Sequence, residues 1–305
     1  MALKIQPLHP EAKTPVLGSS GAAGFDVFCA GAPILRPGPD VVKRFEDVPE
    51  CLKYFYQGKV PELGASTPDF DHICQRFSNT FHFATLYDTN HRIAVYSAYQ
   101  FQHSDGGGRE NRWFVEPQLV NKSWKAEMEE GGLLEKDYPG VYQGAKQALN
   151  EDYTGSGFDR GHLNPNGHHA VPSRNATFTL TNVVPQNRKL NQNAWSTYES
   201  DLTKLFRSHN CFVLVGAVPS KDNWIVKNNV NRVNIPDYIW NAYCCVDNNG
   251  RPVESGAGTA RNTEDNLVEK LSLEKLGEFL REKYNKEVGE LFDNNCKAKD
   301  IEKKG

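Results

Sequence analysis

The amino-acid sequence predicts an α+β fold, in which a central mixed or antiparallel sheet is flanked by helices. Long β-rich runs are the first observation, and segments with leucines at helical spacing are the second. The third is that strands and helices do not alternate regularly, as the parallel sheet of an α/β protein would require. With 305 residues, 38% of them hydrophobic, the chain can bury a sizeable core.

The first half of the chain contains one clear strand pair. Residues 83–101 predict a β-hairpin, because two β-rich runs flank the polar turn formed by Asp88 to His91. Residues 129–140 indicate a surface loop, and residues 141–150 indicate a short helix.

The second half supplies the longer helices and two buried strands. Residues 177–184 alternate as a strand does, and residues 190–206 have the apolar spacing of a helix. Residues 211–219 and 235–246 are apolar enough to form buried strands. Residues 262–284 predict a charged amphipathic helix with a stripe of leucines.

Charge and hydropathy narrow the class of protein. The formal net charge of -3 does not mark a nucleic-acid binder, although a local basic cleft would be enough for an enzyme that must release its product. No apolar run approaches the ~18 residues needed to cross a bilayer, so no membrane partner is expected. The first residues lack the apolar centre of a signal peptide.

The cysteines give the opposite indication about the compartment. Six of the seven cysteines lie in the body of the chain and Cys29 lies outside it: Cys51, Cys74, Cys211, Cys244, Cys245 and Cys296. This even set favours three disulfides of open connectivity and an extracellular or secretory setting, with buried free thiols as the alternative. The signals from the body and from the N-terminus therefore conflict.

Composition divides the chain into an arm of residues 1–40, a body of residues 41–296 and a charged tail of residues 297–305. The segment around Gly24, Phe25 and Asp26 resembles the first motif of trimeric dUTP pyrophosphatases. No counterpart of that family's other motifs follows, so we expect an arm without dUTPase activity. An ordinary strand and turn is the alternative.

The stretch between Asp152 and Glu199 carries the chemistry. Cleavage of a phosphodiester needs a base for water, charge neutralisation on the phosphate and stabilisation of the leaving oxygen. His162 is the candidate base, and Asn191 is the candidate ligand of a divalent metal through its amide oxygen. Arg160, two residues before His162 on an expected strand, would face the same side and bind phosphate.

Structural explanations compete with these roles. His162 could be a buried structural histidine, Asn191 a plain helix residue and Glu199 a solvated helix charge. His168 and His169 suggest a zinc cluster, but no cysteine or carboxylate lies close enough in sequence to complete a usual set of ligands.

Two separated motifs add a family resemblance. The D-R-G-H run at residues 159–162, followed by N-x-x-P-Q at 182–186 and L-N-Q-x-A-W-x-x-x-E at 190–199, resembles the DNA/RNA non-specific endonucleases. That family is built on a ββα-metal (His-Me finger) core. The resemblance implies that His162 activates water and that Asn191 holds one Mg²⁺ or Mn²⁺ ion.

The same resemblance assigns further residues. It implies that Glu199 orders water around the metal and that Asn182 and Gln186 support the site and bind substrate. Arg112, in an R-N-W-like segment displaced by one residue, is the expected second phosphate ligand. An arginine usual after the glutamate is absent, and Lys204 is the nearest cation that could replace it.

Residues 45–296 are also similar to the endonuclease domain-containing 1 proteins, and all six body cysteines lie in matching segments. We therefore expect a metal-dependent, sugar-non-specific endonuclease that contacts DNA and/or RNA through the phosphate backbone. The alternative is a secreted or immune-related binding module on a nuclease scaffold, with little turnover. The oligomeric state stays open.

Overall fold

The computed structural model describes residues 16–17, 25–26, 39–63, 69–108, 110 and 112–297. The chain divides into two units, Met1–Gly38 and Pro39–Gly305. In the first unit, β1 (Val16–Leu17) and β2 (Phe25–Asp26) form an antiparallel pair. The rest of the segment that resembles the dUTP pyrophosphatase motif lies outside the described residues, as does the end of the tail.

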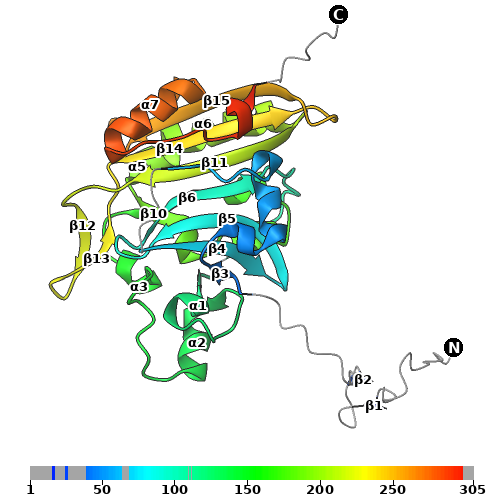
Figure 1. Cartoon of the computed structure of the whole chain (residues 1–305). Helices are drawn as coiled ribbons and strands as arrows, with labels where there is room; N and C mark the ends of the chain where they lie inside the picture. The colour runs from blue at the N-terminus through cyan, green and yellow to red at the C-terminus, as the bar shows by residue number, and fades with distance from the viewer. Residues whose placement is uncertain are drawn as a thin grey trace, which may run out of the picture. The chain divides into compact units, whose positions relative to one another are not determined.

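An eight-stranded sheet forms the centre of the second unit, in the order β16-β15-β14-β11-β6-β5-β4-β3 (Figure 1). All neighbouring strands in it are antiparallel. The strands are β3 (Val41–Val42), β4 (Phe70–Phe77), β5 (Thr80–Asp88), β6 (Ile93–Gln100), β11 (Asn210–Val218), β14 (Tyr238–Val246), β15 (Pro252–Arg261) and β16 (Glu269–Leu271). The predicted α+β fold is confirmed, and its sheet is antiparallel.

Both faces of this sheet are buried. Alternate residues of a strand point to opposite sides, and on this sheet they belong to two different hydrophobic clusters. On β11, Val213 and Val215 belong to one hydrophobic cluster and Leu214 belongs to the other.

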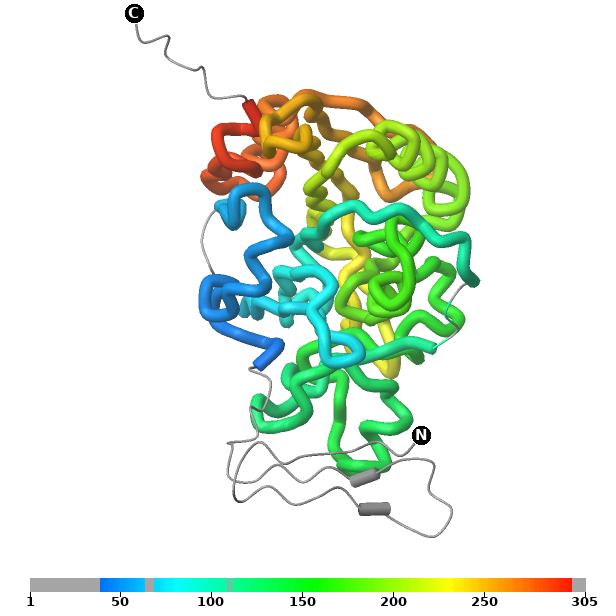
Figure 2. Tube along the Cα trace, turned by 90° about the vertical axis from the view of Figure 1, so that its right-hand side faces the viewer, coloured from blue at the N-terminus to red at the C-terminus, as the bar shows by residue number. Residues whose placement is uncertain are grey.

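The first face is covered by β9, β10 and a long helix. These elements are β9 (Asp159–His162), β10 (Val183–Gln186), α5 (Arg188–Leu190), η6 (Asn191–Trp195) and α6 (Ser196–Phe206). The second face is covered by the segment from η1 (Phe45–Asp47) to η3 (Tyr56–Gly58), by α7 (Leu273–Tyr284) and by the chain that follows α7. Figure 2 shows this division, with the blue and red segments on one side and the green segments on the other.

Short elements complete the second unit. They are η2 (Pro49–Tyr54), β7 (Phe114–Val115), α1 (Pro117–Val120), β8 (Glu129–Glu130), α2 (Gly131–Asp137), α3 (Asn150–Tyr153), η4 (Asn166–His168), α4 (Ser173–Ala176), η5 (Leu180–Asn182), β12 (Trp224–Lys227), β13 (Val230–Asn234) and η7 (Asp293–Cys296). No helix of the described part is long and apolar enough to span a bilayer.

Four predictions of local structure are wrong, two of them between β8 and α3. The expected loop contains α2, because Leu134 inserts into the core there. The expected helix of residues 141–150 is absent until α3 begins at Asn150. Instead, the Gln147 side chain pairs with the backbone of Glu116, accepting from its N–H at 2.8 Å and donating to its carbonyl at 3.0 Å.

The expected strand of residues 177–184 is interrupted by η5, and only its end belongs to β10. The Asn182 N–H donates to the Thr179 carbonyl at 3.0 Å and closes a helical turn there. In this turn the hydroxyls of Thr179 and Thr181 both donate to Glu116 Oε1, at 2.9 and 3.1 Å.

The predicted C-terminal helix is also shorter than expected. Ser272 caps α7 by accepting a hydrogen bond from the Lys275 N–H at 3.2 Å, so the helix begins at Leu273. The residues before it form the edge strand β16, and Leu267 of the expected leucine stripe is 70% exposed.

Three disulfides cross-link the second unit: Cys51–Cys74, Cys211–Cys245 and Cys244–Cys296. The expected number of bridges is confirmed, and the connectivity that the sequence left open is now defined. Cys244–Cys296 ties the end of the described chain to β14, across 52 residues of sequence.

Replacing both Cys244 and Cys296 with alanine should lower the free energy of unfolding by about 2–4 kcal/mol, since the unfolded chain loses a cross-link. Guanidinium unfolding of the oxidised proteins measures this difference. The same comparison under full reduction is the control, because wild type and variant should then converge. Equal stability of the two oxidised proteins would contradict the bridge.

Candidate functional site

A ββα unit carries the residues of the D-R-G-H motif. Strands β9 and β10 are antiparallel, with His162 opposite Val183 and Arg160 opposite Pro185. The chain then continues through α5 and η6 into α6, so the predicted helix of residues 190–206 is confirmed and begins slightly earlier. The Asn187 side chain caps the start of this helix by accepting from the Lys189 and Leu190 N–H groups.

Trp113 brings His162 and Arg160 together. Its ring centroid lies 5.5 Å from that of His162, and the Arg160 guanidinium lies 5.4 Å from the same ring. The Phe178 ring also packs against His162, with the two ring centroids 4.8 Å apart and the ring planes nearly perpendicular. Arg160 also lies 5.3 Å from the Tyr153 ring and donates to the Asn150 carbonyl at 2.9 Å. Both motif side chains are therefore held on one side of β9 by aromatic rings.

Asp159 joins the strand motif to the helix motif. Its Oδ2 accepts hydrogen bonds from Asn191 Nδ2 at 3.1 Å and from Gln192 Nε2 at 2.8 Å, and its Oδ1 lies 3.3 Å from Arg188 Nε. An amide that donates through nitrogen has its oxygen turned the other way, where it can bind a cation. Asn191 also begins a wide π-helical turn, a feature that is frequent at functional sites.

Glu199 lies in a different environment from Asn191. Glu199 is half-buried, and desolvation raises the pKa of its carboxyl group to about 8, an effect that the neighbouring Trp195 side chain opposes. Among the described residues no direct contact joins Glu199 to Asn191. Without a cation, a carboxyl with this pKa is largely protonated at neutral pH.

Gln186 packs against the glycine of the motif. A Cβ on Gly161 would lie within 2.6 Å of the Gln186 Cβ, so only glycine leaves room for this side chain. Gln186 is fully buried, and neither its amide oxygen nor its nitrogen has a hydrogen-bond partner in the described structure. Buried amides are seldom left unsatisfied, which favours an ordered water or a substrate oxygen as the partner.

Asn182, expected to bind substrate, occupies a supporting position. Its Oδ1 accepts from Ser97 Oγ at 2.9 Å and from the Asn164 N–H at 3.0 Å. Its Nδ2 donates to the carbonyls of Asn164 and Thr177, both at 2.9 Å. The side chain is fully buried and its hydrogen bonds are all made, so this geometry favours a structural role.

Arg112, the expected second phosphate ligand, is paired with two carboxylates. Its Nε and Nη2 donate to Glu110 at 3.1 and 3.0 Å, and its Nη1 donates to Glu130 at 2.9 Å. These hydrogen bonds raise the pKa of Arg112 further above its already high value. The guanidinium lies 5.6 Å from the ring of Phe114, the residue after Trp113, and each of its three nitrogens is paired with a carboxylate.

His168 and His169 do not form the zinc cluster considered from the sequence. His168 Nε2 lies 3.1 Å from the Glu199 carbonyl, which can only accept, so this nitrogen carries the proton and Nδ1 accepts from the Tyr99 hydroxyl at 2.8 Å. Burial lowers the pKa of His168 to about 4, and burial also lowers that of His169. His169 Nε2 lies 2.6 Å from Asn164 Oδ1. Both rings are neutral and structural.

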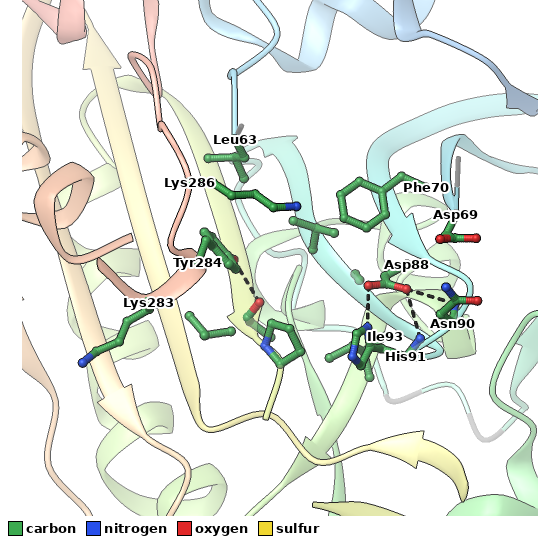
Figure 3. A pocket seen from close by; sticks show the side chains of 15 residues that line it. Leu63, Asp69, Phe70, Asp88, Asn90, His91, Ile93, Lys283, Tyr284 and Lys286 are labelled. Carbon is green, nitrogen blue, oxygen red and sulfur yellow. Dashed lines mark hydrogen bonds and ion pairs between the residues drawn. The ribbon is translucent and has the colours of Figure 1, made fainter. Parts of the chain in front are cut away.

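A cleft of about 690 Å³ adjoins the site and is lined by Trp113, Glu130 and Asn150. A separate, more enclosed cavity of about 300 Å³ lies beside the C-terminal end of α7 (Figure 3). There Asp88 accepts hydrogen bonds from two backbone N–H groups and from His91 Nδ1, at 2.7 Å for the last. None of the site residues expected from the sequence lines this second cavity.

The oxygen donors at the site fit a hard divalent cation. Asn191 Nδ2 faces the Asp159 carboxylate, so the amide oxygen of Asn191 points away from it and is available to a cation, and Mg²⁺ prefers a few such oxygen ligands together with water. In the described part no group of three or more His, Cys, Asp or Glu is placed to hold a metal. Any cation here would also use oxygens of water or substrate.

Trp113, Phe178 and the role of Asp159 are what sequence reasoning missed. Asp159 stands inside the recognised motif, so its sequence position was a usable signal. The two aromatic residues reach His162 from other segments, Trp113 preceding β7 and Phe178 lying between α4 and η5, and no local spacing indicates this.

Replacing Glu199 with glutamine should stabilise the metal-free protein in a pH-dependent way. Its folded pKa of about 8 lies above the ordinary 4.5, so wild type loses stability as pH rises between these values and glutamine does not. For each pKa unit that separates the folded from the unfolded carboxyl group, the free energy of unfolding changes by about 1.4 kcal/mol. Urea unfolding at about pH 5 and about pH 9 measures this, with Glu50→Gln as the exposed control. Parallel pH profiles for wild type and Glu199→Gln would refute the assignment.

Comparison with known proteins finds a nuclease family and several nucleases to which this chain is similar. A family model described as DNA/RNA non-specific endonuclease matches residues 67–299. The endonuclease domain-containing 1 protein of Homo sapiens is 35% identical over 256 residues, which cover 81% of this chain and 47% of that protein. Mitochondrial endonuclease G of Homo sapiens is 47% identical over 73 residues, covering 23% and 25% of the two chains.

A solved structure of the complex of EndoG with EndoGI aligns with a TM-score of 0.49 and 17% identity, covering 76% of this chain and 89% of that one. The chain spans about half the length of the endonuclease domain-containing 1 relatives. The family model covers most of the second unit, and the human relative matches 81% of the chain. The chain therefore belongs to the DNA/RNA non-specific endonuclease family.

Proposed function

We propose that this protein is a divalent-cation-dependent, sugar-non-specific endonuclease that hydrolyses phosphodiester bonds of DNA and/or RNA. Membership of the family supports a hydrolytic nuclease and suggests a divalent cation. The main support for the proposal is the hydrogen bond between Asp159 and Asn191, which connects the D-R-G-H motif to the motif on the helix.

His162 acts as the general base in this proposal. The rings of Trp113 and Phe178 hold its imidazole on one side of β9, where it would take a proton from an attacking water. Arg160, kept beside the same Trp113 ring, neutralises the phosphate. Gln186 supplies an amide to an ordered water or to a substrate oxygen.

Asn191 would hold one Mg²⁺ or Mn²⁺ ion, with its amide oriented by Asp159. Such an ion stabilises negative charge on the phosphate and on the leaving oxygen. Glu199 would order the surrounding water once ionised, and a nearby cation favours ionisation by lowering the pKa of a carboxyl group.

A binding module with little turnover is the second candidate. It is favoured by the state of Arg112, whose guanidinium is occupied by Glu110 and Glu130. Plasmid digestion with Mg²⁺ and with EDTA distinguishes the two functions, since only the enzyme converts supercoiled DNA in a cation-dependent way. The three disulfides and the relatives fit a secretory-pathway protein, and we propose an extracellular setting.

Replacing His162 with alanine should slow cleavage by about 10²–10⁴-fold, because the water loses its base while the cation ligands remain. Plasmid cleavage under saturating Mg²⁺ measures the rate, and circular dichroism checks the fold. His103→Ala, which removes an exposed histidine, is the matched control. A rate within a few-fold of wild type for His162→Ala would remove it from the mechanism.

Replacing Asn191 with aspartate should change the response to metal. The new carboxylate would face Asp159, so the metal-free variant should be less stable, and Mg²⁺ should raise its Tm more than that of wild type. Cleavage should be slower, because the added charge lies near the phosphate. Thermal unfolding with and without Mg²⁺ and parallel cleavage assays measure both effects.

Asn193→Asp is the control for this experiment, since it adds the same charge at an exposed neighbouring position of the helix. It should leave the Mg²⁺ response unchanged. Asn191→Ala should lose both metal binding and cleavage. An unaltered Mg²⁺ requirement in Asn191→Ala would place the metal ligand elsewhere.

A further inference from the structure

The two glutamates around Arg112 occupy both edges of its guanidinium group. Glu110 receives hydrogen bonds from Nε and Nη2, at 3.1 and 3.0 Å, and Glu130 receives one from Nη1 at 2.9 Å. A phosphate bound in a bidentate way needs two adjacent N–H groups on one edge. A backbone phosphate can therefore reach Arg112 fully only by replacing a carboxylate.

The fold places these carboxylates beside Arg112. Strand β8 pairs with β7 so that Glu130 lies opposite Phe114, two residues after Arg112. Glu110 is held in addition by the Arg112 backbone N–H, which donates to Oε1 at 3.2 Å. The pairing is therefore part of the local strand geometry.

The charge and the exposure of this cluster both affect how a nucleic-acid phosphate can approach Arg112. One guanidinium and two carboxylates carry a net charge of about -1, which repels the anionic backbone. The Arg112 side chain is 52% exposed and that of Glu130 is 32% exposed, and exposed ion pairs are weak enough to exchange with a competing anion. Glu130 also lines the cleft that adjoins Trp113.

We propose that Glu110 and Glu130 are intramolecular competitors of backbone phosphate at Arg112, and that they set the affinity of this protein for nucleic acid. The proposal rests on the proposed function in that Arg112 is taken as a phosphate ligand. Glu130 accepts a single hydrogen bond from the Arg112 side chain and therefore exchanges more readily than Glu110, which accepts two.

Glu130→Gln tests this directly, with Glu129→Gln as the matched control. Glu129 is the neighbouring residue of the same strand and loses the same charge, but its partner is Lys125 at 2.6 Å. Binding of a fluorescent oligonucleotide is measured in EDTA at low salt, where cleavage cannot occur in a cation-dependent enzyme. Glu130→Gln should bind about 3–10-fold tighter than Glu129→Gln, and Glu110→Gln combined with Glu130→Gln should bind tighter still.

A double-mutant cycle separates competition at Arg112 from a general change of charge. In an Arg112→Gln background, Glu130→Gln should give no more gain than Glu129→Gln. The proposal is overturned if the gain persists without Arg112, or if Glu130→Gln and Glu129→Gln bind equally in the Arg112 protein. Matching thermal unfolding curves of the variants exclude misfolding as the cause.

Cleavage of plasmid DNA by the same variants in Mg²⁺ tests the proposed function separately. Tighter binding by Glu130→Gln with no cleavage by any variant would retain the competition and reject the nuclease. Cleavage by wild type without a difference in binding would retain the nuclease and reject the competition.

Discussion

One buried amide, that of Asn182, connects the candidate site to the central sheet. It accepts from Ser97 on β6 and bonds to the backbone of Asn164 and Thr177. Leaving any of these buried groups unpaired would be costly, so the three segments have one mutual arrangement. Val183 follows directly and pairs with His162. The position of the His162 imidazole therefore depends on Asn182, a residue that is fully buried.

Much of this architecture is predictable from local pattern. The hairpin of β5 and β6, the buried strands β11 and β14 and the helix up to Phe206 have periodicities that their sequences display. The α7 boundary was misjudged because leucine spacing continues upstream of Ser272, whereas edge pairing with β15 takes the preceding residues. Spacing alone does not reveal which strand edge is available.

The chemical state of the candidate site was harder to foresee. Motif spacing could place Arg112 and Glu199 near the site, but their state depends on groups distant in sequence. Glu130 reaches Arg112 only because β8 pairs with β7, and the pKa of Glu199 is raised only because the fold partly desolvates its carboxyl group. Roles that depend on hydrogen-bond partners or on desolvation are tertiary properties, whereas roles that depend on residue identity can be inferred locally.

The central sheet divides the second unit into two layers of different construction. The side that carries β9, β10 and α6 relies on side-chain hydrogen bonds and aromatic contacts around His162. The opposite side contains the buried cysteines of Cys51–Cys74 and Cys244–Cys296. Cys211–Cys245 belongs to the layer that carries the site, so each layer contains at least one cross-link and two of the three lie on the side away from His162. None of the three bridges uses a residue of the D-R-G-H motif or of the site helix, so a substitution at His162, Asn191 or Glu199 leaves every covalent cross-link of the second unit in place.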